Sequence, residues 1–412
     1  MAQANTSRTI FFAAFEPSGD ILAARLMEEL KRREPTIRFV AFGGPKMQAA
    51  GAELLETTTE HAKMALGALS EVQNHRRRLK VLTAWLKKND IAALVPVDSP
   101  AANWSVCRMV RRHRPKAKVV HLVCPQVWGW ASWRVRRLEK LSDRVLCLLP
   151  FEPDWLGARG VEGLFVGHPV FEEQEAVLAE VSLDGLPGSE RGDGGVLTEG
   201  AGVKLALMPG SRKSELEKNW PTMLEVFRRL SVEHGVEGLR GVVALREPGD
   251  RAVLDAVMEE VGGDLEWPAG LEVVAGRTED ALAWADVVFV KSGTSTLQVA
   301  ARGVPMVAFY NASALVWKVL ARWLISTETF ALPNLVSEWQ GHGRAVPEFI
   351  PHFGAVEPLV DALRPLLLDW HAGSRLPASV AAGARGSVLY ASAQGSGMQL
   401  QRRPDLRALP NR

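Results

Sequence analysis

Two glycine-containing segments in the second half of the chain carry residue types that could bind a diphosphate. Pro209-Gly210-Ser211-Arg212 follows an apolar run and opens a helical pattern. Glycine lets the backbone approach a ligand, a helix start favours an anion, and arginine offers a bidentate fork. Ser292-Gly293-Thr294-Ser295 has the same setting, and Gln298 follows one helical turn later as a polar side chain for a sugar diol. We expect the two segments to hold opposite sides of a nucleotide diphosphate without a metal ion.

Two further segments place carboxylates at the ends of apolar runs in the first half. In Phe15-Glu16-Pro17-Ser18-Gly19-Asp20, Gly19 permits a tight turn and Asp20 can cap the next helix, so that free amides point toward a ligand. Taken alone, capping is the simpler interpretation of this segment. In Val97-Asp98-Ser99-Pro100 the aspartate could act as a general base. An Asx-type turn before the proline explains the same residues.

A fifth segment, Pro125–Trp130, brings two tryptophans close together after an apolar run. Trp128 and Trp130 could form an apolar wall for an acyl chain, with Arg134, Arg136 and Arg137 following. They could equally cover the sheet, and packing alone is the more common role for such residues.

Apolar runs alternate with helical patterns along most of the chain, which is typical of α/β proteins. The runs are continuous in Val, Ile and Leu, as in strands buried on both faces of a parallel sheet. The expected strands are Thr9–Ala14, Arg38–Phe42, Ile91–Val97, Lys118–Val123, Arg144–Leu149, Leu164–Val166, Lys204–Met208, Gly241–Leu245, Leu271–Val274, Val287–Val290 and Met306–Tyr310. The expected helices include Ile21–Arg33, Arg77–Lys88, Met223–Glu233 and Ser295–Ala301.

A glycine-rich stretch divides these elements into two series. We therefore expect a doubly wound domain over residues 1–171, a linker or insertion over 172–202, and a second doubly wound domain over 203–370, with a cleft between the two domains. Residues 371–412 are rich in Ala, Gly and Ser and then basic, which predicts a poorly ordered tail. Ligands of such sheets bind beyond the carboxyl ends of the strands, where the five segments above lie.

The composition excludes several other classes of protein. With 412 residues, 47% of them hydrophobic and 23% charged, the chain is neither collagen-like nor a coiled coil nor wholly disordered. No apolar stretch approaches the roughly 18 residues of a spanning helix, so we expect a soluble cytosolic chain. The sequence has no G-x-G-x-x-G motif at a strand–helix junction, so it does not indicate a nicotinamide or flavin cofactor. The three cysteines and nine histidines show no metal-ligand spacing, so neither a cofactor nor a metal is expected.

The positive charge is concentrated in one segment. Residues 60–144 hold 18 Lys and Arg against 6 Asp and Glu, including the triplet Arg76-Arg77-Arg78, although the whole chain is only +2. Such a segment attracts phosphates of nucleic acid, anionic lipid or a phosphorylated substrate, or it is a solvated basic face with no partner. The absence of a glycine–aromatic pattern argues against nucleic acid.

Taken in order, these segments resemble the lipid A disaccharide synthase family, which has the GT-B architecture of two doubly wound Rossmann-like domains facing a central cleft. The resemblance runs from about Thr9 to about Leu366. It rests on Glu16–Leu22, Gly44–Gly51, Val97–Pro100, Pro125–Trp130, Leu149–Glu152, Gly167–Pro169, Pro209–Arg212, Ser292–Leu297, Pro305–Val307 and Leu332–Leu335.

The resemblance implies an inverting glycosyl transfer without a metal. UDP-2,3-diacylglucosamine would be joined to the 6-hydroxyl of 2,3-diacylglucosamine 1-phosphate, with Asp98 as general base and Arg212 neutralising the departing diphosphate. The implied donor-binding residues are Ser18, Gly19, Pro209, Gly210, Ser211, Arg212, Gly293, Thr294, Ser295, Gln298 and Asn334. From the tryptophan loop and the local charge, we expect the acceptor and lipid contacts to be Trp128, Trp130, Arg76, Arg77 and Arg78.

Four positions depart from the family pattern. Phe15 occupies a position where the family usually has glycine, Ala101 one where it has aspartate, and Ala131 one where it has arginine. Gln298 replaces the carboxylate that would bind the ribose diol. Two alternatives therefore stay open. The chain could be a catalytically impaired UDP-sugar-binding homologue, or another GT-B protein such as a UDP-N-acetylglucosamine transferase or 2-epimerase.

Acyl chains of such substrates reside in a bilayer, which predicts a peripheral position on the inner face of the cytoplasmic membrane. The basic segment beside the tryptophans is the favoured contact with anionic lipid. A second candidate is Ala314–Ile325, where Lys318 and Arg322 are four apart on an apolar helix. A partly buried helix explains that segment more simply. No nucleic acid is expected as a partner, and a homodimer is left open.

Overall fold

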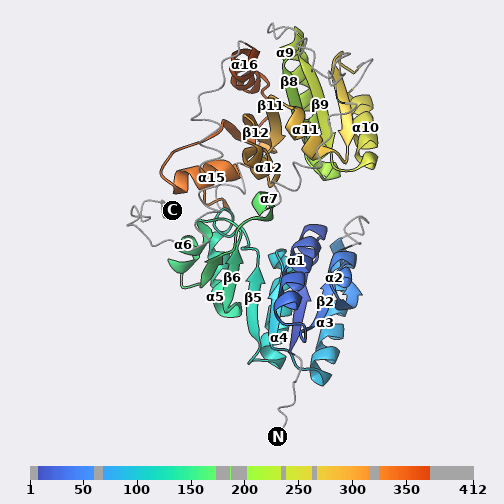
Figure 1. Cartoon of the computed structure of the whole chain (residues 1–412), viewed down its shortest axis with the longest axis vertical. Helices are drawn as coiled ribbons and strands as arrows, with labels where there is room; N and C mark the ends of the chain where they lie inside the picture. The colour runs from blue at the N-terminus through green and yellow to red at the C-terminus, as the bar shows by residue number, and fades with distance from the viewer. Residues whose placement is uncertain are drawn as a thin grey trace. The chain divides into compact units, whose positions relative to one another are not determined.

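The computed structural model describes residues 8–59, 68–172, 186, 202–232, 238–261, 267–314, 317 and 324–371 (Figure 1). The chain forms two compact units, each considered by itself below. Unit 1 is Met1–Val166 with Leu324–Ser326, and unit 2 is Gly167–Trp323 with Thr327–Arg412. The return of residues 324–326 to unit 1 has no counterpart in the expected domains. Three expected segments lie largely or wholly outside the described residues: the linker 172–202, of which only residues 172, 186 and 202 are described, the tail beyond residue 371, and most of the apolar segment 314–325.

Unit 1 is a parallel sheet in the order β3-β2-β1-β4-β5-β6-β7, flanked by helices. Its strands are β1 (Thr9–Ala13), β2 (Arg38–Gly43), β3 (Ala52–Thr57), β4 (Ala93–Pro96), β5 (Lys118–Leu122), β6 (Arg144–Cys147) and β7 (Gly163–Phe165). Its helices are α1 (Pro17–Arg33), α2 (Pro45–Ala49), α3 (Ala68–Lys88), α4 (Pro100–His113), α5 (Val135–Leu141) and α6 (Glu152–Gly157).

Unit 2 repeats this design with a parallel sheet in the order β10-β9-β8-β11-β12-β13. Its strands are β8 (Lys204–Met208), β9 (Arg240–Leu245), β10 (Leu271–Ala275), β11 (Val287–Lys291), β12 (Met306–Asn311) and β13 (Glu348–His352). Its helices are α7 (Pro169–Glu172), α9 (Lys213–Val232), α10 (Arg251–Val261), α11 (Thr278–Trp284), α12 (Ser295–Arg302), α15 (Leu332–Trp339) and α16 (Glu357–His371).

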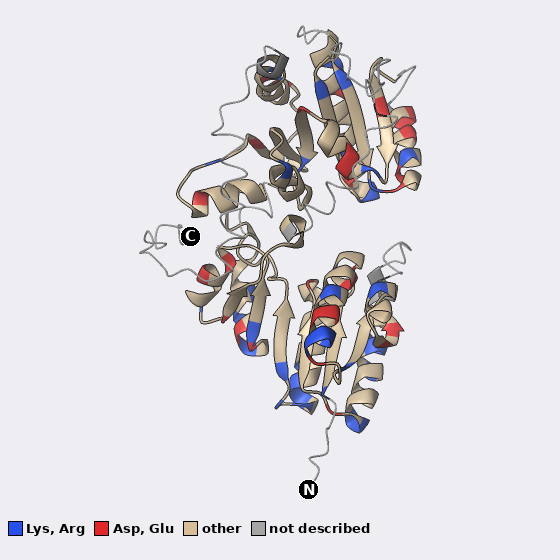
Figure 2. Ribbon diagram, viewed as in Figure 1, with Lys and Arg blue, Asp and Glu red and all other residues tan. Residues whose placement is uncertain are grey.

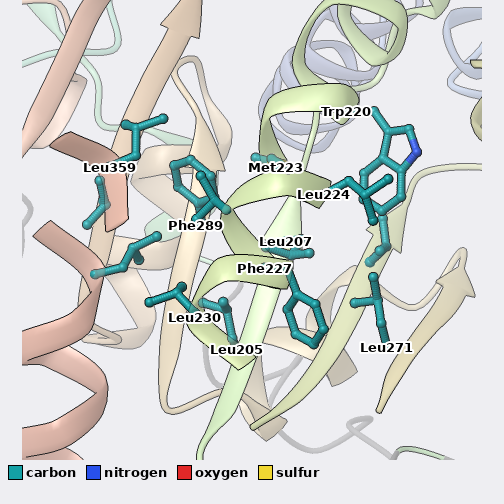
Figure 3. Close-up of a cluster of buried hydrophobic side chains, with 14 of the residues drawn as sticks. Leu205, Leu207, Trp220, Met223, Leu224, Phe227, Leu230, Leu271, Phe289 and Leu359 are labelled. Atoms are coloured by element: carbon teal, nitrogen blue, oxygen red, sulfur yellow. The ribbon is translucent and has the colours of Figure 1, made fainter. Parts of the chain in front are cut away.

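Both sheets are buried on both faces, as the continuous apolar runs predict. In unit 1, Phe11 packs into one layer and its neighbour Phe12 into the opposite layer, both fully buried. In unit 2, α9 places Trp220, Phe227 and other apolar side chains against Leu205 and Leu207 of β8 (Figure 3). Each large apolar side chain buried in this way contributes about 1.5–3 kcal/mol. The strand-end loops are therefore anchored to rigid layers.

All eleven expected strands are present, and the structure adds two at sheet edges. Residues 52–57 of β3 include Glu53 and Glu56 and are largely half-buried, so they lack a continuous apolar run. β13 contains Pro351, and proline within a run argues against a central strand. An edge strand pairs with a neighbour on one side only, so it tolerates polar residues and proline. For this reason the pattern of apolar runs missed both strands.

Candidate functional site

The two predicted diphosphate segments of unit 2 lie side by side. β8 and β11 are hydrogen-bonded neighbours at the point where the strand order reverses, and the two segments follow directly after these strands. In an open α/β sheet, this switch point is where ligands bind. The topology of unit 2 thus brings the two segments next to one another.

Glu215, in the first turn of α9, ties the two segments together. Its carboxylate accepts hydrogen bonds from the amide of Ser211 (3.1 Å) and from Nζ of Lys291 at the end of β11 (2.9 Å). Nη1 of Arg212 lies 3.4 Å from the same carboxylate. Burial raises the pKa of Glu215, but Lys291 and the Ser211 amide outweigh burial and hold the pKa below its usual range.

The glycines of both segments lie close against this ion pair. Gly210 has φ +126°, and a Cβ there would lie 2.7 Å from Cβ and Oε2 of Glu215. Gly293 has φ +155°, and a Cβ there would lie 3.3 Å from Nζ of Lys291. Both loops therefore close against the same pair of charged side chains.

Exposed groups surround the pair. Ser211, Arg212 and Thr294 are exposed, and Gln298 is half-buried in the first turn of α12. At the start of α12 the amides of Thr296 and Leu297 donate to the carbonyls of Gly293 and Thr294 (3.1 and 3.0 Å), so an anion would bind at the loop amides that precede them. Buried Pro209 supports the loop, because its carbonyl accepts a hydrogen bond from Nδ2 of Asn219 (3.0 Å). Ser295 is half-buried at the start of α12.

Asn334, which the resemblance assigns to the donor side, is fully buried in α15. Its Nδ2 donates to the carbonyl of Val346 and to Glu348, and its Oδ1 accepts from the amides of Ala345 and Val346. Two donors and two acceptor positions are the full capacity of the side chain. A direct contact with a donor would therefore cost one of these bonds.

Unit 1 has an equivalent switch point between β1 and β4. Oγ of Ser99 donates a hydrogen bond to Glu16 (3.1 Å), so the two predicted carboxylate segments also adjoin one another. Asp98 and Ser99 both have positive φ, +42° and +36°, a conformation that non-glycine residues adopt at a cost. Nδ2 of buried Asn103 donates to the carbonyls of Val97 (2.9 Å) and Asp98 (2.8 Å) and holds this turn in place.

The predicted roles of Gly19 and Asp20 were wrong in detail. Gly19 is a helical residue of α1, and a Cβ there would lie 3.3 Å from Cγ1 of Val97, so it permits close packing on the sheet. The carboxylate of Asp20 caps α2, accepting from the amides of Gly44, Lys46 and Met47, all at 3.0 Å. Ser18 is exposed in the first turn of α1.

The two tryptophans after β5 have different environments. Trp128 is 8% exposed, stacks edge-on against Phe151 and donates from Nε1 to Glu152 (3.0 Å), so it packs in the interior. Trp130 is 45% exposed. It is held by pairing of its loop with residues 324–326, including a bridge to Ile325. Of the two residues, only Trp130 offers a surface to a lipid.

Beneath this loop, Cys124, Cys147 and Glu152 form a buried cluster whose ligand atoms lie within 4.8 Å of one another. The group could hold a metal ion by residue type, but both oxygens of Glu152 already accept hydrogen bonds, from Trp128 and from the amide of Leu149. Burial raises the pKa of Glu152 to about 7. The three cysteines are buried, as expected, but the proximity of Cys124 and Cys147 was not apparent from their spacing in the sequence.

The arginine triplet does not form one exposed patch. Arg76 and Arg77 are exposed, but the side chain of Arg78 is only 13% exposed and binds Glu56 (2.8 Å), which also binds Arg77 (2.6 Å). Other cations of the basic segment gather where α3 and α4 end and β5 begins, at the amino edge of the sheet (Figure 2). That edge is opposite the Asp98 loop. Several of these cations are paired, as Arg111 is with Asp143 (2.7 Å).

The remaining departures from the family pattern are Phe15, Ala101 and Ala131, and their environments differ. The ring of Phe15 contacts His75 of α3 and lies under the guanidinium of Arg78. Ala101 is exposed in the first turn of α4. Ala131 is 2% exposed with φ +50°, and its amide donates to the carbonyl of Leu324.

Comparison with known proteins gives a consistent result over nearly the whole chain. A family model described as lipid-A-disaccharide synthetase matches residues 10–369. A lipid-A-disaccharide synthase of Azotobacter vinelandii is 35% identical over 367 residues, covering 87% of this chain and 89% of the relative. One of Granulibacter bethesdensis is 32% identical, covering 93% and 99%.

Solved structures share the fold at low sequence identity. A putative UDP-N-acetylglucosamine 2-epimerase from Listeria monocytogenes is 14% identical, with a TM-score of 0.60 and 95% of each chain covered. A glycosyltransferase from Rickettsia africae is 12% identical, with a TM-score of 0.53, covering 93% of this chain and 94% of that one. These likenesses confirm the predicted GT-B fold of two Rossmann-like units.

Proposed function

The chain belongs to the lipid-A-disaccharide synthetase family, and from this premise we propose that it transfers a diacylated glucosamine from UDP to a diacylated glucosamine 1-phosphate. The observation that carries the proposal is the match over residues 10–369, which includes the loops at both switch points. The two relatives described above are named for this activity, and the match to this chain covers 89% and 99% of their lengths. No observation favours the epimerase or the impaired homologue.

The chemistry that we propose is a single inverting displacement. The 6-hydroxyl of the acceptor attacks the anomeric carbon of the donor, the bond to UDP breaks, and the carboxylate of Asp98 takes the hydroxyl proton. Arg212 neutralises charge on the departing diphosphate. The turn that holds Asp98 supports this role, because backbone strain at Asp98 and Ser99 is a feature of functional loops.

We assign the diphosphate to the switch point of unit 2. The amides of Gly210, Gly293 and Thr294 and the guanidinium of Arg212 supply its donors, and Gln298 lies one turn along α12 for the ribose diol. The Ser211 amide already donates to Glu215, so it contributes by holding the loop. The resemblance also assigns Ser18 and Gly19 to donor binding. Both residues lie in unit 1, and of the two, Ser18 is exposed and has a side-chain hydroxyl.

UDP release from purified protein tests the proposal. We expect release with the acylated donor and acceptor together, much slower release when either lacks its acyl chains, and a disaccharide 1-phosphate as product. Release with acyl-free UDP-N-acetylglucosamine, or its conversion to the 2-epimer, would instead favour another GT-B activity. UDP binding without turnover would favour the impaired homologue.

We also propose that unit 1 contacts an anionic bilayer, because the substrates carry acyl chains. Exposed Trp130 and Trp133 offer rings of the kind that reside at membrane interfaces, and exposed Arg76 and Arg77 add positive charge to the same unit. Within the described part of the chain, no helix is both long and apolar enough to cross a membrane. For the homodimer, the described residues supply no supporting observation.

A further inference from the structure

The ion pair of Glu215 and Lys291 is an unusual feature to find between two anion-binding loops. Its side chains are 11% and 17% exposed, and they connect segments that are 76 residues apart. Removing two charges from water costs several kcal/mol per ion, so a pair this buried adds little to stability by itself. A carboxylate at this point would also repel a diphosphate if its charge were not balanced. The arrangement is therefore better explained by what Lys291 can do for a ligand.

The ammonium group of Lys291 has donors to spare. It carries three N–H groups, and the hydrogen bond to Oε1 of Glu215 uses one of them. Nζ lies 5.5 Å from the centroid of the Tyr310 ring and 3.3 Å from the position of a Cβ on Gly293. The absence of a side chain at Gly293 thus leaves the ammonium group next to the loop backbone that opens α12. A phosphate bound at this loop would lie within reach of a second N–H group.

We propose that Lys291 is a second phosphate-binding cation of the donor site and that Glu215 is the positioning residue that holds its ammonium group between the two loops. The inference rests on the proposed function, since it concerns the diphosphate of the same UDP-linked donor. It adds a positive charge on the β11 side of the site, opposite Arg212 on the β8 side. Two cations from two loops would neutralise the two phosphates of UDP more fully than Arg212 alone.

Calorimetric titration with UDP and with uridine tests the contact to phosphate. We expect Lys291→Met to weaken UDP binding about tenfold or more, as for loss of one charge-assisted hydrogen bond, and to change uridine binding less than twofold. Lys291→Arg, which keeps the charge, should recover part of the UDP affinity. Lys204→Met is the matched control, because Lys204 is the first residue of β8 and lies at the amino end of the strand, away from the loop at its carboxyl end. This substitution should leave both affinities unchanged.

The outcomes separate this inference from the proposed function. If the unaltered protein binds no UDP, the proposed donor site itself is wrong. If it binds UDP and Lys291→Met binds UDP equally well, the second cation is wrong and the donor site stands. Equal losses for UDP and uridine would mean that Lys291 only holds the loops together, which would also overturn the phosphate contact.

A double-mutant cycle tests the positioning role of Glu215. If Glu215 acts through Lys291, Glu215→Gln should lower the ratio of UDP affinity to uridine affinity in the otherwise unaltered protein. The same substitution should change that ratio at least threefold less when Lys291→Met is already present. An equal change in both backgrounds would place the effect on Arg212, the other cation near the carboxylate, and would overturn this role. Thermal unfolding of each variant shows that the comparison is made between folded proteins.

Discussion

Single residues decide the chemistry of each loop, and Asp98 is the clearest case in unit 1. Its left-handed backbone would be kept by asparagine, which tolerates positive φ better than most residues. We expect Asp98→Asn to lower the rate of sugar transfer by about 10²–10⁴, the usual contribution of a general base. UDP affinity should stay unchanged, because we assign the diphosphate to unit 2. Full transfer activity in this variant would show that another group takes the proton.

Gln298 tests the ribose side of the donor site. An amide oxygen can accept a bond from one hydroxyl, but it lacks the charge that makes such bonds about twice as strong. We expect Gln298→Glu to tighten UDP binding by about 0.5–1.5 kcal/mol, measured by calorimetry. Unchanged or weaker binding would mean that this half-buried residue does not face the ribose.

Glu152 should make stability depend on pH. Its pKa is raised by burial from 4.5 to about 7, so the folded state binds a proton that the unfolded state releases over that range. The unfolding free energy should therefore fall as the pH rises from 4.5 to 7, by about 1.4 kcal/mol per pH unit relative to Glu152→Gln. Urea unfolding of both proteins at several pH values measures the difference. Parallel pH profiles would show that the carboxyl is already ionised in the folded protein.

At the scale of elements, the loops work because rigid strands and helices fix their ends. Gly210 sits between β8 and α9, and its lack of a Cβ lets Glu215 reach the Ser211 amide. We expect Gly210→Ala to lower UDP affinity at least tenfold and to reduce stability by about 1–3 kcal/mol, from the steric contact at 2.7 Å and the positive φ. Gly249→Ala is the control, because nothing lies within 4 Å of a Cβ there. Equal effects of the two substitutions would contradict the steric argument.

At the scale of the whole molecule, binding to a bilayer is the property to test. We expect reversible, salt-sensitive sedimentation with anionic vesicles, since each cation near such a surface adds about 1 kcal/mol. Arg76→Ser with Arg77→Ser should weaken binding, and Trp130→Ser should weaken it further at high salt. Arg251→Ser with Arg364→Ser removes the same charge from unit 2 as a control. Sedimentation unaffected by ~0.5 M salt and by the arginine variants would exclude electrostatic docking.

Local sequence determined the strands and the loops that follow them. Continuous apolar runs such as Lys204–Met208 specify buried strands by themselves, and glycine, hydroxyl and arginine after a run specify an anion-binding turn. The ordered motifs also identified the family. The sequence pattern did not predict edge strands such as β3, because a strand that is less buried needs fewer apolar residues.

Tertiary structure alone decided which side chains meet. Glu215 and Lys291 look like unrelated polar residues in the sequence, and only the pairing of β8 with β11 brings them to 2.9 Å. Trp128 and Trp130 differ by two positions, yet one is buried on Glu152 and the other is exposed. Local patterns encode the period of an element and its caps, whereas burial and charge pairing depend on neighbours that are distant in the chain. For this reason the sequence located the loops, and the folded sheets determined which of their residues act together.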